Sequence, residues 1–250
     1  SIVAGVLSRI RTEGDAAVLD YEKQFDKVQL TSLRVSEAEI QEASLLVSDE
    51  LKKALQTAKQ NIAAFHAAQK HQCIEVVTTT GVTCRQKAVA IEKVGLYVPG
   101  GTAPLFSTVL MLAIPAQIAG CKEICITTPP LANGKINPVI LAAAKIAGVD
   151  RIFKTGGAQA IAALAYGTET IPKVDKIVGP GNAFVAEAKK QVFGQVSIDM
   201  IAGPSEILII ADSKTNPAHA AADLLSQAEH DKMASAVLVT DSIELANNVS

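Results

Sequence analysis

The feature that most constrains the fold is an alternation of short apolar runs with small-residue helical patterns between Val94 and Gly203. Each apolar run ends near glycine or proline. Parallel strands need a connection of about a dozen residues or more, so this alternation predicts a parallel sheet with crossover helices. The predicted strands are 94–98, 123–127, 151–154, 176–178 and 196–200, and the predicted helices are 107–118, 138–147, 158–166 and 183–191.

The flanking segments carry different patterns. Residues 1–70 have helical periodicity with a capping box at Ser36 and Glu39, and residues 73–90 are rich in β-branched side chains around a glycine turn, which predicts a hairpin. After Gly203 the strand and helix alternation resumes, and we interpret it as a return to the first domain. The sequence therefore predicts an α/β protein with a helical N-terminal region, a first domain of residues 1–96 and 206–250, and an inserted domain of residues 97–205.

Composition and charge argue against some classes of function. The chain has 250 residues, 49% of them hydrophobic, and a formal net charge of −2 with dispersed basic residues, so we expect no nucleic-acid partner. No apolar run reaches the roughly 20 residues that span a bilayer, and the N-terminus lacks a signal-peptide pattern, so we expect a cytoplasmic protein with no membrane partner. Residues 241–249 predict a helix without a partner for its apolar side chains, and we expect the chain to be part of a longer protein.

Three glycine-rich turns follow predicted strands, at residues 99–102, 155–159 and 179–182. In open parallel sheets ligands bind outside the carboxyl ends of the strands, where glycine and a helix N-terminus accommodate a phosphate. None of the turns has the G-x-G-x-x-G pattern: in the nearest, Phe184 replaces the third glycine and Pro180 lacks an amide donor. The turns alone leave open a dinucleotide site or ordinary α/β connections.

Four side chains at or beside glycine-containing turns are candidate ligand contacts. Tyr97 either stacks on a planar ligand or is a strand aromatic with a solvated hydroxyl. Gln159 and Asn182 either bond a ribose or cap a helix, and for Asn182 the pattern favours capping. Ser205 lacks the nucleophile-elbow pattern, so we interpret it as a turn residue whose hydroxyl can contact a substrate.

Gln227 and His230 lie three residues apart on a predicted helix, so their side chains share a face and can converge on a metal ion. A zinc ion expects about four ligands, so further groups would come from elsewhere. The alternative for His230 is a cation that stabilises the helix C-terminus, and Asp223 is either a further group on the same face or a solvated charge.

Five long runs together resemble histidinol dehydrogenases: VGLYVPGGTAPLFSTVLM (94–111), GGAQAIAALAYGTE (156–169), KVDKIVGPGN (173–182), AGPSE (202–206) and DLLSQAEH (223–230). The resemblance covers nearly the whole chain. It implies a zinc-dependent homodimer that oxidises L-histidinol to L-histidine through the aldehyde with two NAD molecules, the last step of histidine biosynthesis. It also implies two Rossmann-like domains, the second inserted into the first.

Carried over residue by residue, the resemblance implies that Tyr97, Gln159 and Asn182 contact NAD, that Ser205 contacts the substrate, and that Gln227 and His230 bind both zinc and substrate. It places the acid and base residues, a Glu–His pair, in sequence that would follow Ser250. We therefore expect no catalytic residue in these 250 residues and no turnover by them alone. Two alternatives stay open: a related zinc and NAD dehydrogenase of another small polar alcohol, such as a sulfonated diol, and a non-catalytic nucleotide-binding module.

Overall fold

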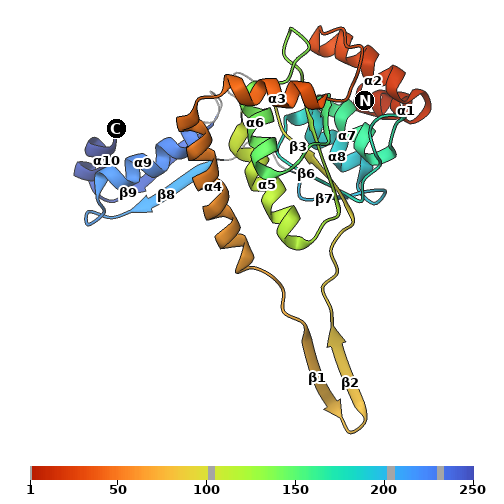
Figure 1. Ribbon diagram of the computed structural model, residues 1–250. Coiled ribbons are helices and arrows are strands. Elements are labelled where there is room, and N and C mark those ends of the chain that lie inside the picture. The colour runs from red at the N-terminus through yellow and green to blue at the C-terminus, as the bar shows by residue number, and fades with distance from the viewer. Residues whose placement is uncertain (1, 101–104, 202–205, 230–233) are drawn as a thin grey trace. The chain divides into compact units, whose positions relative to one another are not determined.

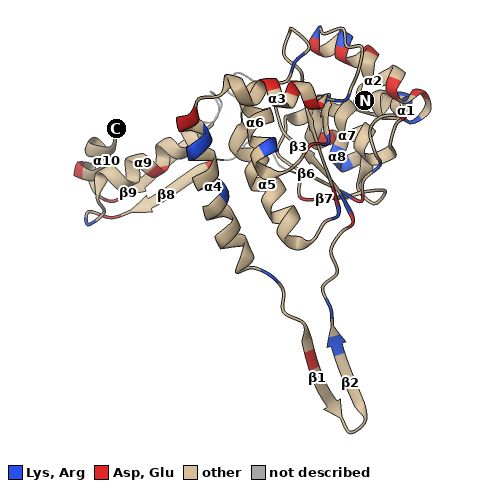
Figure 2. Cartoon of the chain, in the orientation of Figure 1, with Lys and Arg blue, Asp and Glu red and all other residues tan. Residues whose placement is uncertain are grey.

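The computed structural model describes residues 2–100, 105–201, 206–229 and 234–250 and divides into two compact units, Ser1–Ile201 and Ala202–Ser250 (Figure 1). Each unit is described by itself. Among the described residues, no helix has both the length and the apolar character needed to cross a bilayer. Lys and Arg are interspersed with Asp and Glu along the chain, as Figure 2 shows.

A five-stranded parallel sheet forms the centre of the first unit, with the order β5-β4-β3-β6-β7. In chain order this arrangement is 3-2-1-4-5, the order of doubly wound sheets, in which the direction of winding reverses between the first and fourth strands. The predicted alternation is thus confirmed as a parallel sheet. The strands are β3 (Lys93–Tyr97), β4 (Glu123–Thr128), β5 (Ile152–Lys154), β6 (Lys176–Val178) and β7 (Ser197–Ile198).

Helices cover both faces of this sheet in two hydrophobic clusters. One cluster joins α1, α2, α7 and α8 and contains Tyr97, and the other joins α3, α4, α5 and α6 and contains Leu96, because successive strand residues point to opposite faces. The central helices are α5 (Phe106–Ala119), α6 (Pro138–Ala147), α7 (Gly157–Tyr166) and α8 (Ala183–Val192). The N-terminal helical elements are α1 (Ile2–Glu13), α2 (Asp15–Tyr21), the π-helical turn η1 (Glu22–Asp26), α3 (Glu37–Leu46) and α4 (Asp49–Ala67).

The N-terminal helices belong to the same compact unit as the sheet. Helix α1 packs on α7, α3 packs on α6, and α4 packs on α5. Every residue of α7 from 158 to 165 is buried, as expected of a helix enclosed on all sides. Residues on both sides of position 96 belong to one compact unit. The association of residues 1–96 with 206–250 stays a prediction.

The predicted hairpin is formed by β1 (Ile74–Thr79) and β2 (Val82–Gln86), which pair antiparallel across Gly81. All residues from 67 to 92 are exposed, including the apolar Val77 and Val89. The hairpin therefore contributes no side chain to the core of the described unit.

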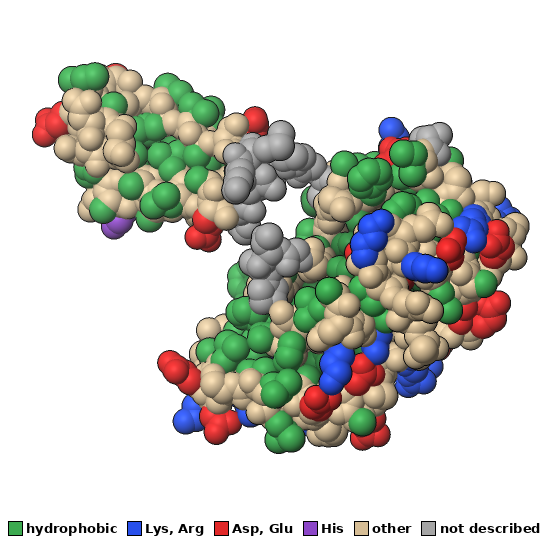
Figure 3. All heavy atoms as spheres, turned by 90° about the horizontal axis from the view of Figure 1, so that it is seen from above, with side chains coloured by type: hydrophobic (Ala, Val, Ile, Leu, Met, Phe, Trp, Pro, Cys, Tyr) green, Lys and Arg blue, Asp and Glu red, His purple; other side chains and the backbone are tan. Residues whose placement is uncertain are grey.

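The second unit contains two parallel strands, β8 (Ile207–Ala211) and β9 (Ala236–Thr240), with α9 (Pro217–Ala228) and α10 (Ile243–Val249). Helix α9 contains Gln227, in agreement with the helix predicted there, and the helix predicted over residues 241–249 is confirmed as α10. Ile207 and Ile209 lie on the less exposed face of the strand pair. The opposite face is apolar and 47 to 78% exposed, and it consists of Leu208, Ile210, Val237 and Val239. Figure 3 shows hydrophobic side chains exposed on the surface of each unit.

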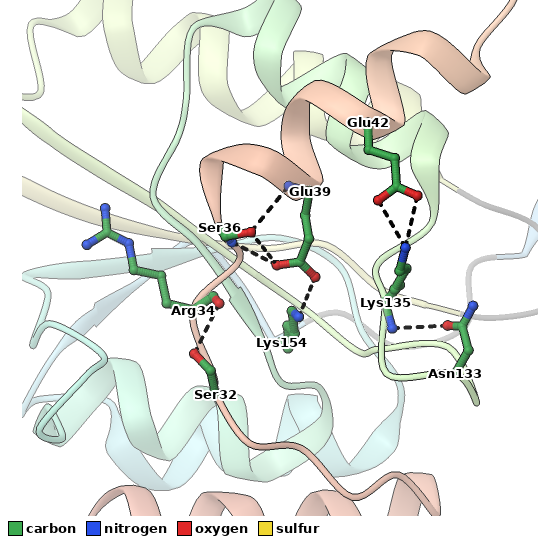
Figure 4. A network of polar contacts seen from close by, with 8 residues as sticks. All are labelled: Ser32, Arg34, Ser36, Glu39, Glu42, Asn133, Lys135 and Lys154. Atoms are coloured by element: carbon green, nitrogen blue, oxygen red, sulfur yellow. Dashed lines mark hydrogen bonds and ion pairs between the residues drawn. The ribbon is translucent and has the colours of Figure 1, made fainter.

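A polar network ties helix α3 to strand β5, as Figure 4 shows. The predicted capping box is confirmed, because Ser36 Oγ accepts from Glu39 N at 3.2 Å and Glu39 Oε2 accepts from Ser36 N at 2.8 Å. The other oxygen, Glu39 Oε1, accepts from Lys154 Nζ at 2.5 Å. Burial raises the pKa of Glu39, but the bonds from Lys154 and Ser36 outweigh it and leave that pKa below its ordinary value.

We expect Glu39→Ala to lower the free energy of unfolding by about 2 kcal/mol, since it removes both a helix cap and a charge-assisted hydrogen bond. Glu39 has its pKa depressed in the folded protein. Its contribution is therefore present above the unfolded pKa and is lost as pH falls through the folded pKa. Urea unfolding at about pH 7 and about pH 3 measures both effects.

The matched control is Glu42→Ala. Glu42 pairs with Lys135 at 3.0 Å, but both side chains are more than half exposed, against 21% and 10% for Glu39 and Lys154. Loss of the exposed pair should cost less than about 0.5 kcal/mol. Equal losses for the two variants would contradict the structural role given to the Glu39 network.

Candidate nucleotide-binding site

A cavity of about 340 Å³ lies at the carboxyl ends of the strands, and the three predicted cofactor residues Tyr97, Gln159 and Asn182 all line it. They come from the end of β3, from α7 and from the residue before α8. Other lining residues come from α1, from η1 (including Asp26), from the start of α7 and α8, and from Gly100 and Pro129. Parallel sheets bind ligands at this edge, near the strands where winding reverses.

A wider hollow, of about 650 Å³, borders Gly148 and Asp150, which precede β5. It therefore lies at the amino ends of the strands, the edge at which open α/β sheets do not place their ligands. We take the smaller cavity as the candidate site.

Tyr97 is the last residue of β3 and is only 3% exposed. Its hydroxyl oxygen accepts a hydrogen bond from Gly157 N at 3.1 Å. Burial raises the pKa of Tyr97 to about 12, so the phenol stays neutral at physiological pH and keeps a proton to donate. The hydroxyl thus braces the glycine turn after β5, which differs from the solvated hydroxyl that the sequence left open.

Gln159 is 2% exposed and occupies the first turn of α7. Its Nε2 donates to Glu22 Oε1 at 3.1 Å. No cap hydrogen bond involves its side chain, because the N-cap position belongs to Gly156. Of the two interpretations of Gln159, helix capping is therefore wrong.

Asn182 is the N-cap of α8, and its Oδ1 accepts from Phe184 N and Val185 N, both at 3.1 Å. The capping interpretation is confirmed. Because the oxygen is directed at the helix, the side-chain nitrogen is the atom that can donate to a ligand in the cavity.

The turn after β6 is fixed from two sides. Gly179 has a φ of 132°, and a Cβ there would overlap the carbonyl oxygen of Tyr97. Lys189, 2% exposed, donates to Gly179 O at 2.6 Å and to Asp199 Oδ1 at 2.5 Å, while Asp199 Oδ2 accepts from Gly179 N at 2.8 Å. Backbone contact and the ion pair between the buried Lys189 and the partly exposed Asp199 thus hold the turn that leads to Asn182.

Two acidic residues of η1, Glu22 and Asp26, were not among the candidate residues predicted from the sequence. Glu22 is fully buried and bonds the turn after β5, and Asp26 lines the cavity. A signal was present, because Glu22 stands four residues after Val18 and three before Phe25, on the apolar stripe of a helical pattern. A carboxyl on such a stripe is buried and needs donors.

The residues predicted to bind substrate and metal are mostly outside the described part of the chain. Ser205 and His230 lie outside the described residues. Gln227 lies in the last turn of α9 and is partly exposed. Among residues 2–100, 105–201, 206–229 and 234–250, no three His, Cys, Asp or Glu side chains are grouped to hold a metal ion.

Comparison with known proteins identifies the family. The histidinol dehydrogenase family profile matches residues 1–250. The chain belongs to the histidinol dehydrogenase family. It is 60% identical over 248 residues to the histidinol dehydrogenase of Bacteroides fragilis (strain ATCC 25285), covering 99% of this chain, and 57% identical over 250 residues, the whole of this chain, to that of Lactiplantibacillus plantarum.

The crystal structure of histidinol dehydrogenase from Elizabethkingia anophelis shares the fold, with a TM-score of 0.95 and 52% identity over 99% of this chain. The chain spans 58% of the length of the two curated histidinol dehydrogenases and 57% of the crystallised one. The α/β fold described above is thus that of the corresponding part of a histidinol dehydrogenase.

We expect Lys189→Met to lower the free energy of unfolding by about 3 kcal/mol, because it leaves Asp199 and Gly179 O without their buried partner. The neighbouring Lys190 is exposed, so Lys190→Met should change stability by less than about 0.5 kcal/mol. Denaturant unfolding of both variants checks the difference. A Lys189 variant as stable as the Lys190 variant would show that the ion pair does not hold the turn.

Proposed function

We propose that this chain forms the NAD-binding part of a histidinol dehydrogenase, with Tyr97, Gln159 and Asn182 in contact with the dinucleotide. The observation that carries the proposal is that these three residues line one cavity at the carboxyl ends of the parallel strands. Tyr97 and Asn182 supply hydrogen-bond donors to it, and Gln159 supplies an amide oxygen. Ribose hydroxyl and carboxamide groups can pair with such a set.

The proposed reaction is the oxidation of L-histidinol to L-histidine through L-histidinal. Bound NAD supplies the hydride acceptor in each of the two oxidations. The described residues bind and orient the dinucleotide, and none of them is assigned as the acid or base. Proton transfer in this reaction is proposed to depend on a Glu–His pair outside these 250 residues, which contributes about two to four decades in rate.

The zinc and substrate contacts are part of the same proposal. Gln227 and His230 would bind zinc and substrate, and Ser205 would contact substrate. Gln227 supplies an oxygen donor from the end of α9, and its helical spacing from His230 supports this pairing. Membership of the family also supports the predicted homodimer, the cytoplasmic location and the description as two Rossmann-like domains, the second inserted into the first.

Two other functions make different predictions. A zinc and NAD dehydrogenase of another small polar alcohol would reduce NAD with that alcohol and not with histidinol, so a substrate panel separates the two. A non-catalytic nucleotide-binding module would retain neither zinc nor dehydrogenase activity in any longer protein. Identity of 57 to 60% to curated histidinol dehydrogenases favours the first proposal.

Asn182 offers a test of the NAD contact apart from its structural role. Asn182→Ser keeps an N-cap oxygen but removes the amide donor, so stability should hold while NAD affinity falls about fivefold, the loss of about one hydrogen bond. Asn182→Ala should lose the same affinity and about 1 kcal/mol of stability. Calorimetric titration with NAD and urea unfolding measure the two quantities.

The matched control for Asn182→Ser is Asn216→Ser, because Asn216 caps α9 in the second unit through the same kind of bond, to Ala218 N at 2.9 Å. It should leave NAD affinity unchanged. If Asn182→Ser binds NAD as tightly as the unaltered chain, Asn182 is only a helix cap.

The activity itself is tested by following NADH formation with L-histidinol. The 250-residue chain alone should bind NAD but turn over at least about a hundredfold more slowly than a longer protein that contains it and the Glu–His pair. Equal rates would show that the acid and base lie within these 250 residues.

A further inference from the structure

A buried carboxyl, Glu22, connects the N-terminal helices to the turn that carries Gln159. Its Oε1 accepts from Thr155 Oγ1 at 2.7 Å, from Gly156 N at 3.4 Å and from Gln159 Nε2 at 3.1 Å. Glu22 is fully buried and lies more than 130 residues from these donors in sequence. Because three groups donate to this one oxygen, the Glu22 carboxyl is held in a fixed orientation.

The second oxygen of Glu22 faces a different neighbour. Oε2 is buried and has no hydrogen-bond partner among the described residues, and the carboxyl of Asp26, one helical turn away, is near enough to act on the charge of Glu22. Burial raises the pKa of Glu22 to about 8, and the charge of Asp26 adds to the effect.

This arrangement fixes which end of the Gln159 amide faces the cavity. The nitrogen is committed to Glu22, so the oxygen takes the other side, next to Gly157, where an added Cβ would lie 2.7 Å from Gln159 Oε1. Gly157 lines the cavity, and no described residue donates to Gln159 Oε1. The amide oxygen is therefore available to a ligand.

The charges around the cavity indicate which part of a ligand fits there. Its described lining contains the acid Asp26 and no lysine or arginine. A phosphate would meet a carboxyl without a compensating cation, whereas a hydroxyl or amino group would find acceptors at Asp26 and at Gln159 Oε1.

We propose that Glu22 is a positioning residue of the nucleotide site and holds the Gln159 amide oxygen toward the cavity. Gln159 and Asp26 together then accept hydrogen bonds from an uncharged donor group of the nucleotide, a ribose hydroxyl or an amino group. This inference rests on the proposed function for the identity of the ligand as NAD. The orientation of Gln159 by Glu22 rests on their hydrogen bond and does not depend on the identity of the ligand.

The test compares Glu22→Gln with Glu22→Met. Glutamine keeps an acceptor for Gln159 and gains a donor for Asp26, so NAD affinity should stay within about twofold; methionine keeps the volume but removes the acceptor, and affinity should fall about tenfold. Calorimetric titration with NAD gives the affinities, and urea unfolding shows that each variant is folded. A folded Glu22→Met chain that binds NAD like the unaltered chain would overturn the inference.

A second measurement does not depend on NAD. Proton exchange of the Gln159 side-chain amide, followed by NMR, should be slow in the unaltered chain and in Glu22→Gln, and fast in Glu22→Met. Fast exchange in the unaltered chain would overturn the inference even if Glu22→Met did not fold. If exchange behaves as expected but the unaltered chain does not bind NAD, the orientation stands and the proposed function fails.

The pH profile separates positioning from a purely structural role. The titratable groups that face Glu22 are Asp26 on its own turn and Tyr97 on β3, and the α7 residue in contact, Gln159, does not titrate. As pH rises through about 8 the Glu22 carboxyl loses its proton, and repulsion between it and Asp26 should weaken NAD binding in the unaltered chain. Glu22→Gln should show a flat profile, and a flat profile in both proteins would contradict the proposal.

Discussion

The close approach of the Gly179 turn to the end of β3 fixes the floor of the candidate site. Backbone meets backbone there, since a Cβ at Gly179 would overlap the Tyr97 carbonyl oxygen. The two strands concerned, β3 and β6, are the neighbours at which the winding of the sheet reverses. Helices that follow them leave on opposite faces, so a crevice opens above the contact, and Tyr97 and Asn182 reach it from either side.

Buried polar groups set the orientation of the side chains around that crevice. In the Glu22 and Lys189 networks, each charged group is hydrogen-bonded to named partners, because an unpaired charge in a low-dielectric interior is costly. Hydrophobic packing alone would place α7 and α8 on the sheet but would leave the amide of Gln159 free to rotate. The apolar core thus determines where the helices lie, and the polar networks determine how the side chains on them are oriented.

Much of this arrangement follows from the sequence. The strands of the parallel sheet and the helices between them appear within a few residues of their predicted bounds, because each has a clear period and ends in glycine or proline. Tyr97, Gln159 and Asn182 could be brought together in advance because carboxyl ends of parallel strands share one edge. The packing partners of α1 to α4 could not, since an amphipathic pattern shows that a helix has a buried face and does not show which surface covers it.

The hydrogen-bond partners of Glu22 could not be predicted from the sequence. Its place on an apolar stripe predicts that it is buried, but its donors lie on the turn after β5, and only the assembled fold brings the two together. A carboxyl there is tolerated only when that turn is formed, and the turn has its amide groups satisfied only when η1 is docked. The N-terminal helices are therefore part of the candidate site in a physical sense, because the orientation of Gln159 depends on a residue that they supply.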